Sequence, residues 1–190
     1  MRLCMIAAAT CNNLIGINGA LACRHLPDMR FFRKVTMGHP IIFGRKTWEE
    51  AGTLPGRTNI VVSRSLNPND APHNVVFVNT PEEALAAAIA RTLGDMVFVA
   101  GGAEIYKAFE PHYTDILLTR LDTEPLVKEG DTPTFINLDF MKDYQVVDVR
   151  NLSPIAQVGH FSKDAEATTL LSAKYTCHIQ PHQPAAAAHA

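Results

Sequence analysis

A turn between a predicted strand and a predicted helix carries residue types that could hold an anion. It follows the apolar run 40–43 and contains Gly44, Arg45 and Lys46. A glycine lets the backbone approach a ligand closely, and free amides at a helix start attract negative charge, to which the two cations add. These residues predict a phosphate site or, equally well, an ordinary turn with solvated basic side chains.

A second turn of the same kind follows the apolar run 96–100, where Gly101 and Gly102 precede a helical pattern. This glycine pair falls short of a full dinucleotide fingerprint, so alone it favours a tight structural turn. A third apolar run ends with Ser63 and Arg64. Parallel strands end at one edge of a sheet, so three such ends together indicate a dinucleotide lying across that edge.

Asp28 is the carboxylate best suited to recognise a nitrogen-rich ring. It stands at the head of an apolar-faced segment that includes Phe32. As an ordinary acid in the first turn of a helix it would lie on the surface, which is the commoner outcome for an Asp after Pro. Alternatively, it sits at the mouth of an apolar pocket and accepts two hydrogen bonds from an amidine-like ring edge.

The elements that must position these residues are short apolar runs with helical patterns between several of them. The runs are continuous instead of alternating, which implies burial on both faces, as in a mostly parallel sheet covered by helices. We expect strands over residues 3–8, 40–43, 59–63, 75–78, 96–100 and 116–121, and helices over residues 27–35, 47–51, 81–93 and 103–109. Residues 144–149 and 174–179 alternate more and predict an antiparallel C-terminal edge. The predicted fold is α/β, with a central mostly parallel twisted sheet flanked by helices.

Residues 10–26 predict a long irregular loop between the first strand and the first helix. Loops of this length inside a compact domain are usually functional and often act as lids. A chain of 190 residues with 47% hydrophobic content favours one domain, which we place at residues 1–179. Residues 180–190 lack a core-facing pattern and predict a disordered tail.

Composition and charge argue against several classes of function. The net charge is -2 and the basic residues are scattered, which argues against nucleic acid as a partner. No stretch approaches the roughly 20 apolar residues that a membrane helix requires. The four cysteines lack the spacing of a metal site, so we expect no bound metal and reduced thiols in a cytoplasmic protein. The first residues mimic a signal peptide, but we favour a first buried strand.

Taken together, these motifs resemble the dihydrofolate reductase family from the first strand to about Ile179. They follow in the family's order and at nearly its spacing. The matching residues are Ile6-Ala7-Ala8, Leu14-Ile15-Gly16, Asp28 with Phe31-Phe32-Arg33-Lys34, the run from Ile41 to Glu49, Leu54-Pro55-Gly56-Arg57, Asn59 to Ser63, Gly101 to Tyr106, Leu118-Thr119 and Gly130-Asp131-Thr132.

The resemblance implies that NADPH is the cofactor. The cationic and hydroxyl groups of Arg45, Ser63 and Arg64 would surround the 2'-phosphate that distinguishes NADPH from NADH. The implied cofactor-binding residues are Ala8, Ile15, Gly16, Ala20, Gly44, Arg45, Lys46, Thr47, Val62, Ser63, Arg64, Ala100, Gly101, Gly102, Ala103, Glu104, Ile105 and Tyr106.

The resemblance also implies a small-molecule substrate, a 7,8-dihydropterin that accepts hydride at C6. Asp28, the implied catalytic residue, would bind the pterin's amino group and ring nitrogen with support from Thr119. Atom N5 would take a proton from water, whose access the 10–26 loop controls. The implied substrate-binding residues are Ile6, Ala8, Asp28, Met29, Phe32, Leu54, Arg57, Ala100 and Thr119.

The departures from the family pattern concern the substrate side. Ala22-Cys23 stands where the family has Pro-Trp, and Ala51 and Ala100 stand where it has bulkier aliphatic residues. A wider pocket fits a pterin with extra methyl groups, and in this the chain resembles dihydromethanopterin reductase of methylotrophic bacteria. We narrowly favour dihydromethanopterin as substrate on this ground.

Two alternatives stay open. Arg57 matches the residue that holds the glutamate carboxylate of folate, which favours dihydrofolate. A catalytically inactive nucleotide-binding homologue is the non-enzymatic alternative. The reductase domain of riboflavin synthesis matches less well at Asp28 and Thr119, and the sequence does not predict the oligomeric state.

Overall fold

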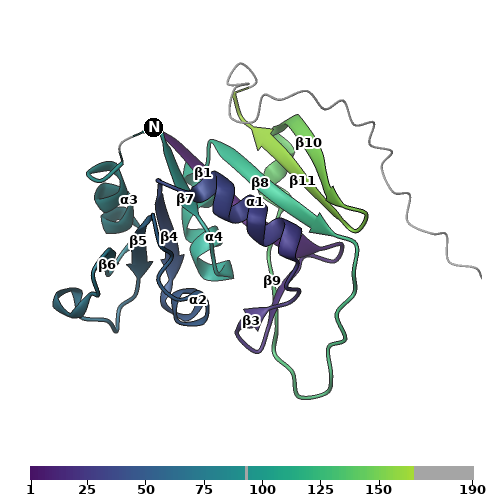
Figure 1. Ribbon diagram of the computed structural model, residues 1–190, viewed down its shortest axis with the longest axis horizontal. Coiled ribbons are helices and arrows are strands. Elements are labelled where there is room, and N and C mark those ends of the chain that lie inside the picture. The colour runs from purple at the N-terminus through teal and green to yellow at the C-terminus, as the bar shows by residue number, and fades with distance from the viewer. Residues whose placement is uncertain (93, 165–190) are drawn as a thin grey trace, which may run out of the picture.

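The computed structural model describes residues 1–92 and 94–164, and a twisted eight-stranded sheet forms its centre (Figure 1). Its strand order is β10-β11-β8-β1-β7-β4-β5-β6. The strands are β1 (Arg2–Thr10), β4 (Pro40–Gly44), β5 (Thr58–Val62), β6 (Val75–Val78), β7 (Met96–Val99), β8 (Asp115–Leu121), β10 (Gln145–Ser153) and β11 (Ala156–Ser162). Strands from β6 to β8 run parallel, and β11 and β10 add an antiparallel edge. This arrangement confirms the predicted fold class.

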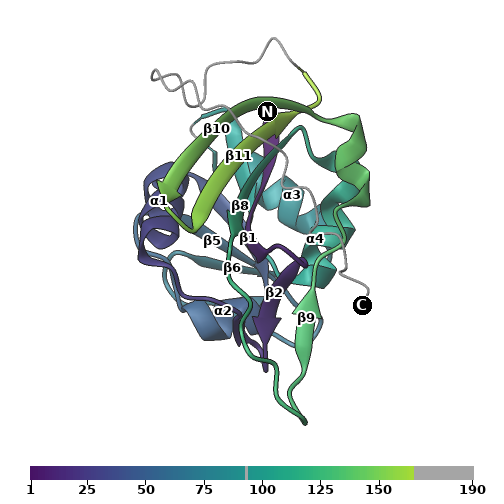
Figure 2. The same ribbon diagram turned by 90° about the vertical axis from the view of Figure 1, so that its right-hand side faces the viewer.

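Helices cover both faces of the sheet (Figure 2). Helices α1 (Leu26–Thr36) and α2 (Arg45–Ala51) share an apolar cluster with Phe43, whereas α3 (Pro81–Ile89) and α4 (Ala103–Phe109) share the opposite one with Ile42. Successive strand residues point to opposite faces, so an uninterrupted apolar run buries side chains on both. None of the helices in residues 1–92 and 94–164 is long and apolar enough to cross a membrane.

Helix α3 begins as the sequence predicts and ends earlier. The Thr80 hydroxyl accepts a hydrogen bond from the Glu83 amide at 3.2 Å, and Pro81 occupies the first turn. The helix was expected to reach residue 93 but ends at Ile89. Three short 3-10 turns, η1 (Pro68–Asp70), η2 (Glu110–His112) and η3 (Asp139–Asp143), complete the described helical elements.

The prediction of an irregular loop over residues 10–26 is wrong in its middle. That segment contains β2 (Leu14–Ile17) and β3 (Ala20–Leu21), which form a small three-stranded sheet with β9 (Pro133–Phe135). Asn18 and Gly19 join β2 to β3 with φ angles of 54° and 84°. Asn-Gly suits a two-residue hairpin turn, because both central residues need positive φ.

The antiparallel edge is longer than expected. Strand β10 extends the predicted 144–149 segment to Ser153, and β11 was not predicted. The alternation in β11 places His160 and Ser162 inward, so its buried face does not look apolar in the sequence. The expected strand 174–179, the domain end at 179 and the 180–190 tail lie outside the described residues.

A buried polar cluster joins the amino-terminal ends of β1 and β8 to β11. Asp115 is fully buried, and its carboxylate accepts hydrogen bonds from Arg2 Nε and Thr114 Oγ1, both at 2.7 Å. His160 Nε2 lies 2.9 Å from Asp115 Oδ1. Burial by itself would raise the pKa of Asp115, but the hydrogen bonds from His160, Arg2 and Thr114 outweigh it and lower the pKa to about 2.

We expect Asp115→Asn to lower the free energy of unfolding at pH 7 by about 3 to 5 kcal/mol, because it leaves buried partners without their counter-charge. Because the folded-state pKa is depressed, the wild-type contribution is present above about pH 4 and is lost as pH falls towards 2. Urea titrations across this pH range measure both effects. The exposed Asp122→Asn serves as control, and a loss no larger than that of the control would contradict the prediction.

Candidate active site

Adjacent parallel strands bring the two predicted glycine turns together. Strands β7, β4 and β5 are neighbours, so the turns that follow them meet at one edge of the sheet. The Gly44 amide donates a hydrogen bond to the Gly101 carbonyl at 2.8 Å. Ser63 follows β5 at the same edge, where its amide donates to the Val78 carbonyl at 2.8 Å.

A Cβ on the glycines at this edge would make tight contacts with neighbouring side chains. A Cβ on Gly44 would lie 3.0 Å from Ile105 Cγ1, and one on Gly102 would lie 3.3 Å from Thr47 Oγ1. Gly101 has a φ of 114°, which L side chains rarely adopt. No side chain caps α2 or α4, so amides of both first turns stay available to an anion. Ala103, exposed Glu104, half-buried Ile105 and buried Tyr106 form the first turn of α4.

Cationic groups lie on the outer side of these turns. Arg45 Nη1 donates to both Glu49 carboxylate oxygens, at 2.8 and 3.0 Å, while Lys46 and Arg64 are exposed. The Ser63 hydroxyl is buried and engaged with Ser65, whose amide donates to it at 3.2 Å. Half-buried Thr47 and Val62 complete the expected set on α2 and β5. The ion pair with Glu49 was not predicted, although its four-residue spacing on a helix could have indicated it.

Asp28 occupies a half-buried position in the first turn of α1. Thr119 stands opposite Ala8 in the parallel pairing of β8 and β1, and its side chain acts on the Asp28 carboxyl. Burial raises the pKa of Asp28, and the Thr119 side chain partly opposes this rise because it favours the charged carboxylate. The surface interpretation of Asp28 is therefore wrong.

Apolar residues from separate parts of the chain pack together under α1, the helix that carries Asp28. Ile6, Phe32, Leu54 and Ala100 all belong to or pack against the cluster under α1 and α2. Met29 does not join them, because 43% of it is exposed. The buried Tyr106 hydroxyl donates to the Ile6 carbonyl at 2.8 Å, and burial, with the charge of Asp28, raises the pKa of Tyr106.

Comparison with known proteins identifies the family of this chain. The model of the family described as dihydrofolate reductase matches residues 2–154. The chain belongs to the dihydrofolate reductase family. It is 39% identical over 147 residues to dihydrofolate reductase type 8 of Escherichia coli, which covers 74% of this chain and 83% of the relative.

Other members of the dihydrofolate reductase family are about as similar. Dihydrofolate reductase HdrB of Haloferax volcanii is 37% identical over 142 residues, covering 70% of each chain. Dihydrofolate reductase of Haemophilus influenzae is 38% identical over 134 residues, covering 70% of this chain and 78% of the relative.

Arg57, expected on the substrate side of this family member, is a buried cation. Its Nη1 donates to Thr36 Oγ1 at 3.2 Å and its Nε to the Pro55 carbonyl at 3.1 Å. Burial lowers the pKa of Arg57, and the charge of Arg33 lowers it further. Arg33 was not predicted as a site residue, and its five-residue separation from Asp28 on α1 gave no signal, because residues on one helix face are three or four apart.

The small β2–β3 hairpin follows the carboxyl end of β1. Ile15 packs against the apolar cluster on the α3 and α4 side, and the Ile15 carbonyl accepts a hydrogen bond from the Ala22 amide at 3.0 Å. A Cβ on Gly16 would lie 2.9 Å from the Ala20 carbonyl oxygen, and Ala20 itself is exposed. These positions border the end of the strand that carries Ile6 and Ala8.

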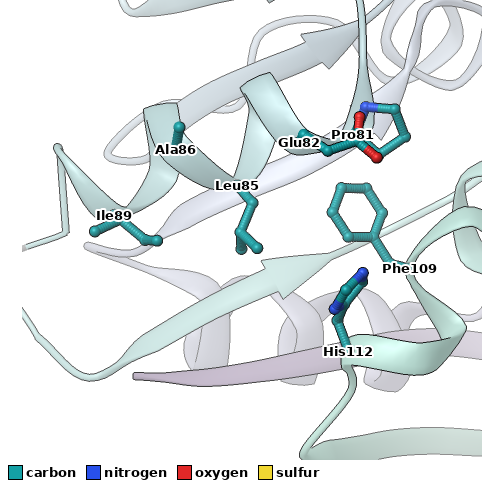
Figure 3. Close-up of a pocket in the computed structure, with 7 residues that line it drawn as sticks. All are labelled: Pro81, Glu82, Leu85, Ala86, Ile89, Phe109 and His112. Carbon is teal, nitrogen blue, oxygen red and sulfur yellow. The ribbon is translucent and has the colours of Figure 1, made fainter.

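A hollow on the other face of the sheet contains none of the predicted site residues. It lies between α3 and η2 and is lined mainly by Leu85, Ile89 and Phe109, with Glu82 and His112 at its rim (Figure 3). The described residues hold no group of three or more histidine, cysteine or acidic side chains placed to bind a metal ion.

We expect Thr119→Val to raise the pKa of Asp28 further. Valine keeps the size of threonine but removes the hydroxyl that favours the charged carboxylate. The pKa is measured by NMR titration of the labelled carboxyl carbon. Thr114→Val, at the other end of β8, is the control, and an unchanged Asp28 pKa in Thr119→Val would contradict the assignment.

Proposed function

We propose that this protein reduces a 7,8-dihydropterin to the tetrahydropterin with NADPH. The carrying observation is a half-buried carboxylate, Asp28, whose pKa responds to Thr119 and whose charge acts on Tyr106, the residue that packs against Gly101. Membership of the dihydrofolate reductase family supports the reaction class.

The residues at the sheet edge fit NADPH. A Cβ at Gly44 or Gly102 would press on the side chains of Ile105 or Thr47, and their absence leaves backbone to face the pyrophosphate. Arg45 and Arg64 would bind the 2'-phosphate, and Ile15, Gly16 and Ala20 would border the nicotinamide. Bound NADPH would supply the hydride that pterin C6 accepts.

Asp28 would anchor the other reactant. Its ionised carboxylate would accept hydrogen bonds from the pterin amino group and a ring nitrogen, and Thr119 would hold that carboxylate in place. The carboxylate polarises the ring from the edge remote from N5, so N5 would receive its proton from water. Phe32 would pack on the flat face of the ring.

Dihydrofolate is the substrate that the relatives favour, and we now place it ahead of dihydromethanopterin. The similar proteins named above are called dihydrofolate reductases. Buried Arg57, with Arg33 near it, offers two cations that match the two carboxylates of a glutamate arm.

Dihydromethanopterin is the second candidate because large side chains are missing on the substrate side. Cys23 is half-buried where the family has tryptophan, and Ala51 and Ala100 are small. These positions favour a pterin that carries extra methyl groups.

Steady-state NADPH oxidation with each dihydropterin tests the proposal. A kcat/KM for dihydrofolate at least tenfold above that for dihydromethanopterin would support the first candidate, and the reverse ratio would support the second. Tight NADPH binding without oxidation in the presence of either pterin would identify an inactive nucleotide-binding homologue.

We expect Asp28→Asn to lose at least about 100-fold in kcat/KM. The charged carboxylate that accepts two hydrogen bonds from the pterin becomes a neutral amide, and the NH2 of that amide faces an N–H donor of the ring. The dissociation constant of NADPH should stay within about twofold, which fluorescence titration can check. Wild-type turnover in this variant would remove Asp28 from the mechanism.

We expect Arg45→Ala to weaken NADPH binding by about 10- to 100-fold and NADH binding much less, since only NADPH carries the 2'-phosphate. Titration calorimetry with both nucleotides measures the ratio, and Arg91→Ala, in the turn that follows α3, is the matched control. Equal losses for the two nucleotides would refute the assignment of Arg45.

A further inference from the structure

His25 is the N-cap residue of helix α1, a position where histidine is uncommon. As the N-cap residue, its Nδ1 accepts a hydrogen bond from the Asp28 backbone amide at 3.4 Å. Serine, threonine, aspartate and asparagine satisfy such an amide better. An imidazole at this position can also make a second contact that a shorter side chain cannot reach.

That second contact reaches the β10–β11 hairpin. His25 Nε2 lies 3.0 Å from Ser153 Oγ, at the end of β10, and Figure 2 places the hairpin turn beside α1. Because Nδ1 accepts from an amide, the proton of the neutral ring must be on Nε2, which then donates to Ser153 Oγ. The Ser153 hydroxyl also accepts from the Ile155 amide at 3.3 Å, which fixes it in the turn.

The same hairpin supports the partner of Asp28. Strand β11 pairs with β8 so that Val158 stands opposite Thr119, and α1 packs against β10. The hairpin thus holds Thr119 through backbone pairing and the start of α1 through the imidazole. Asp28 and Thr119, which belong to different elements, share one support.

We propose that His25 is a positioning residue for Asp28, because its imidazole bridges the Asp28 amide to Ser153 and so fixes the carboxylate against Thr119. This inference rests on the proposed function of Asp28. It assigns a role in catalysis to a contact between α1 and a hairpin that follows it by more than 100 residues. The imidazole acts through Asp28 and does not itself meet the substrate.

Two variants separate capping from bridging. His25→Asn keeps a good N-cap but is too short to reach Ser153, so we expect wild-type thermal stability and a kcat/KM for the dihydropterin lowered about tenfold, or about 1.4 kcal/mol. Ser153→Ala keeps the cap and removes the bridge, so it should show a similar loss. The double variant should lose no more than either single one, because both remove the same contact.

Thr80→Ala is the matched control for a lost cap. It removes the N-cap contact of α3, on the opposite face of the sheet, so it should lower the melting temperature and leave kcat/KM unchanged. Dissociation constants for NADPH should stay within about twofold in all variants. Full activity in His25→Asn or Ser153→Ala, additive losses in the double variant, or an equal activity loss in Thr80→Ala would overturn the proposal.

An NMR measurement tests the bridge without turnover. Long-range proton–nitrogen spectra should show the ring proton of His25 on Nε2 in the wild type and, because the cap is kept, in Ser153→Ala as well. A ring proton on Nδ1 in the wild type would overturn the bridge. An inactive wild type, or an active Asp28→Asn, would instead refute the proposed function, and the tautomer would still report on the bridge.

Discussion

The strands of a parallel sheet all end on the same side of the sheet, and this constraint decides where the turns that follow them meet. The turns after β4, β5 and β7 meet at that edge because those strands are neighbours with one direction. Helix α1 adds Asp28 from one face, while Tyr106 of α4 reaches the Ile6 carbonyl from the other. The chemistry-bearing groups are therefore gathered by topology, although they are far apart in the sequence.

The amino-terminal ends of the strands carry a buried polar cluster instead. At the start of β1 and β8, the Asp115 carboxylate accepts hydrogen bonds from Arg2 and Thr114 and contacts His160 in one buried cluster. This cluster ties the antiparallel edge to the parallel core at the amino-terminal end of the strands. Stability and binding are thus separated along the strands, so the carboxyl edge can keep backbone amides free of side-chain caps.

The sequence predicted what depends on local patterns. Continuous apolar runs located the parallel strands, glycines located the turns, and the Thr80-Pro81 pair located the start of α3. It missed what depends on distant partners. Strand β11 turns His160 and Ser162 inward, where His160 lies 2.9 Å from Asp115, 45 residues earlier, and Ser162 Oγ donates to the Thr114 carbonyl at 3.4 Å. The contact between His25 and Ser153 was missed for the same reason, because the two residues are 128 positions apart. Met29 follows Asp28 in the sequence yet is exposed, because a residue's helical phase, not its proximity to Asp28, decides its exposure.

The pairing of β2 with β9 determines how the β2–β3 hairpin, which follows the carboxyl end of β1, can move. Asn18 at the hairpin tip exchanges backbone and side-chain hydrogen bonds with Thr132 and donates its side-chain amide to Asp131 at 2.7 Å. The hairpin is consequently no free flap hinged at its two ends. Any outward swing must either break these bonds or carry the strand around Thr134 along, so displacement of residues 14–21 is mechanically coupled to a stretch of chain more than 110 positions downstream.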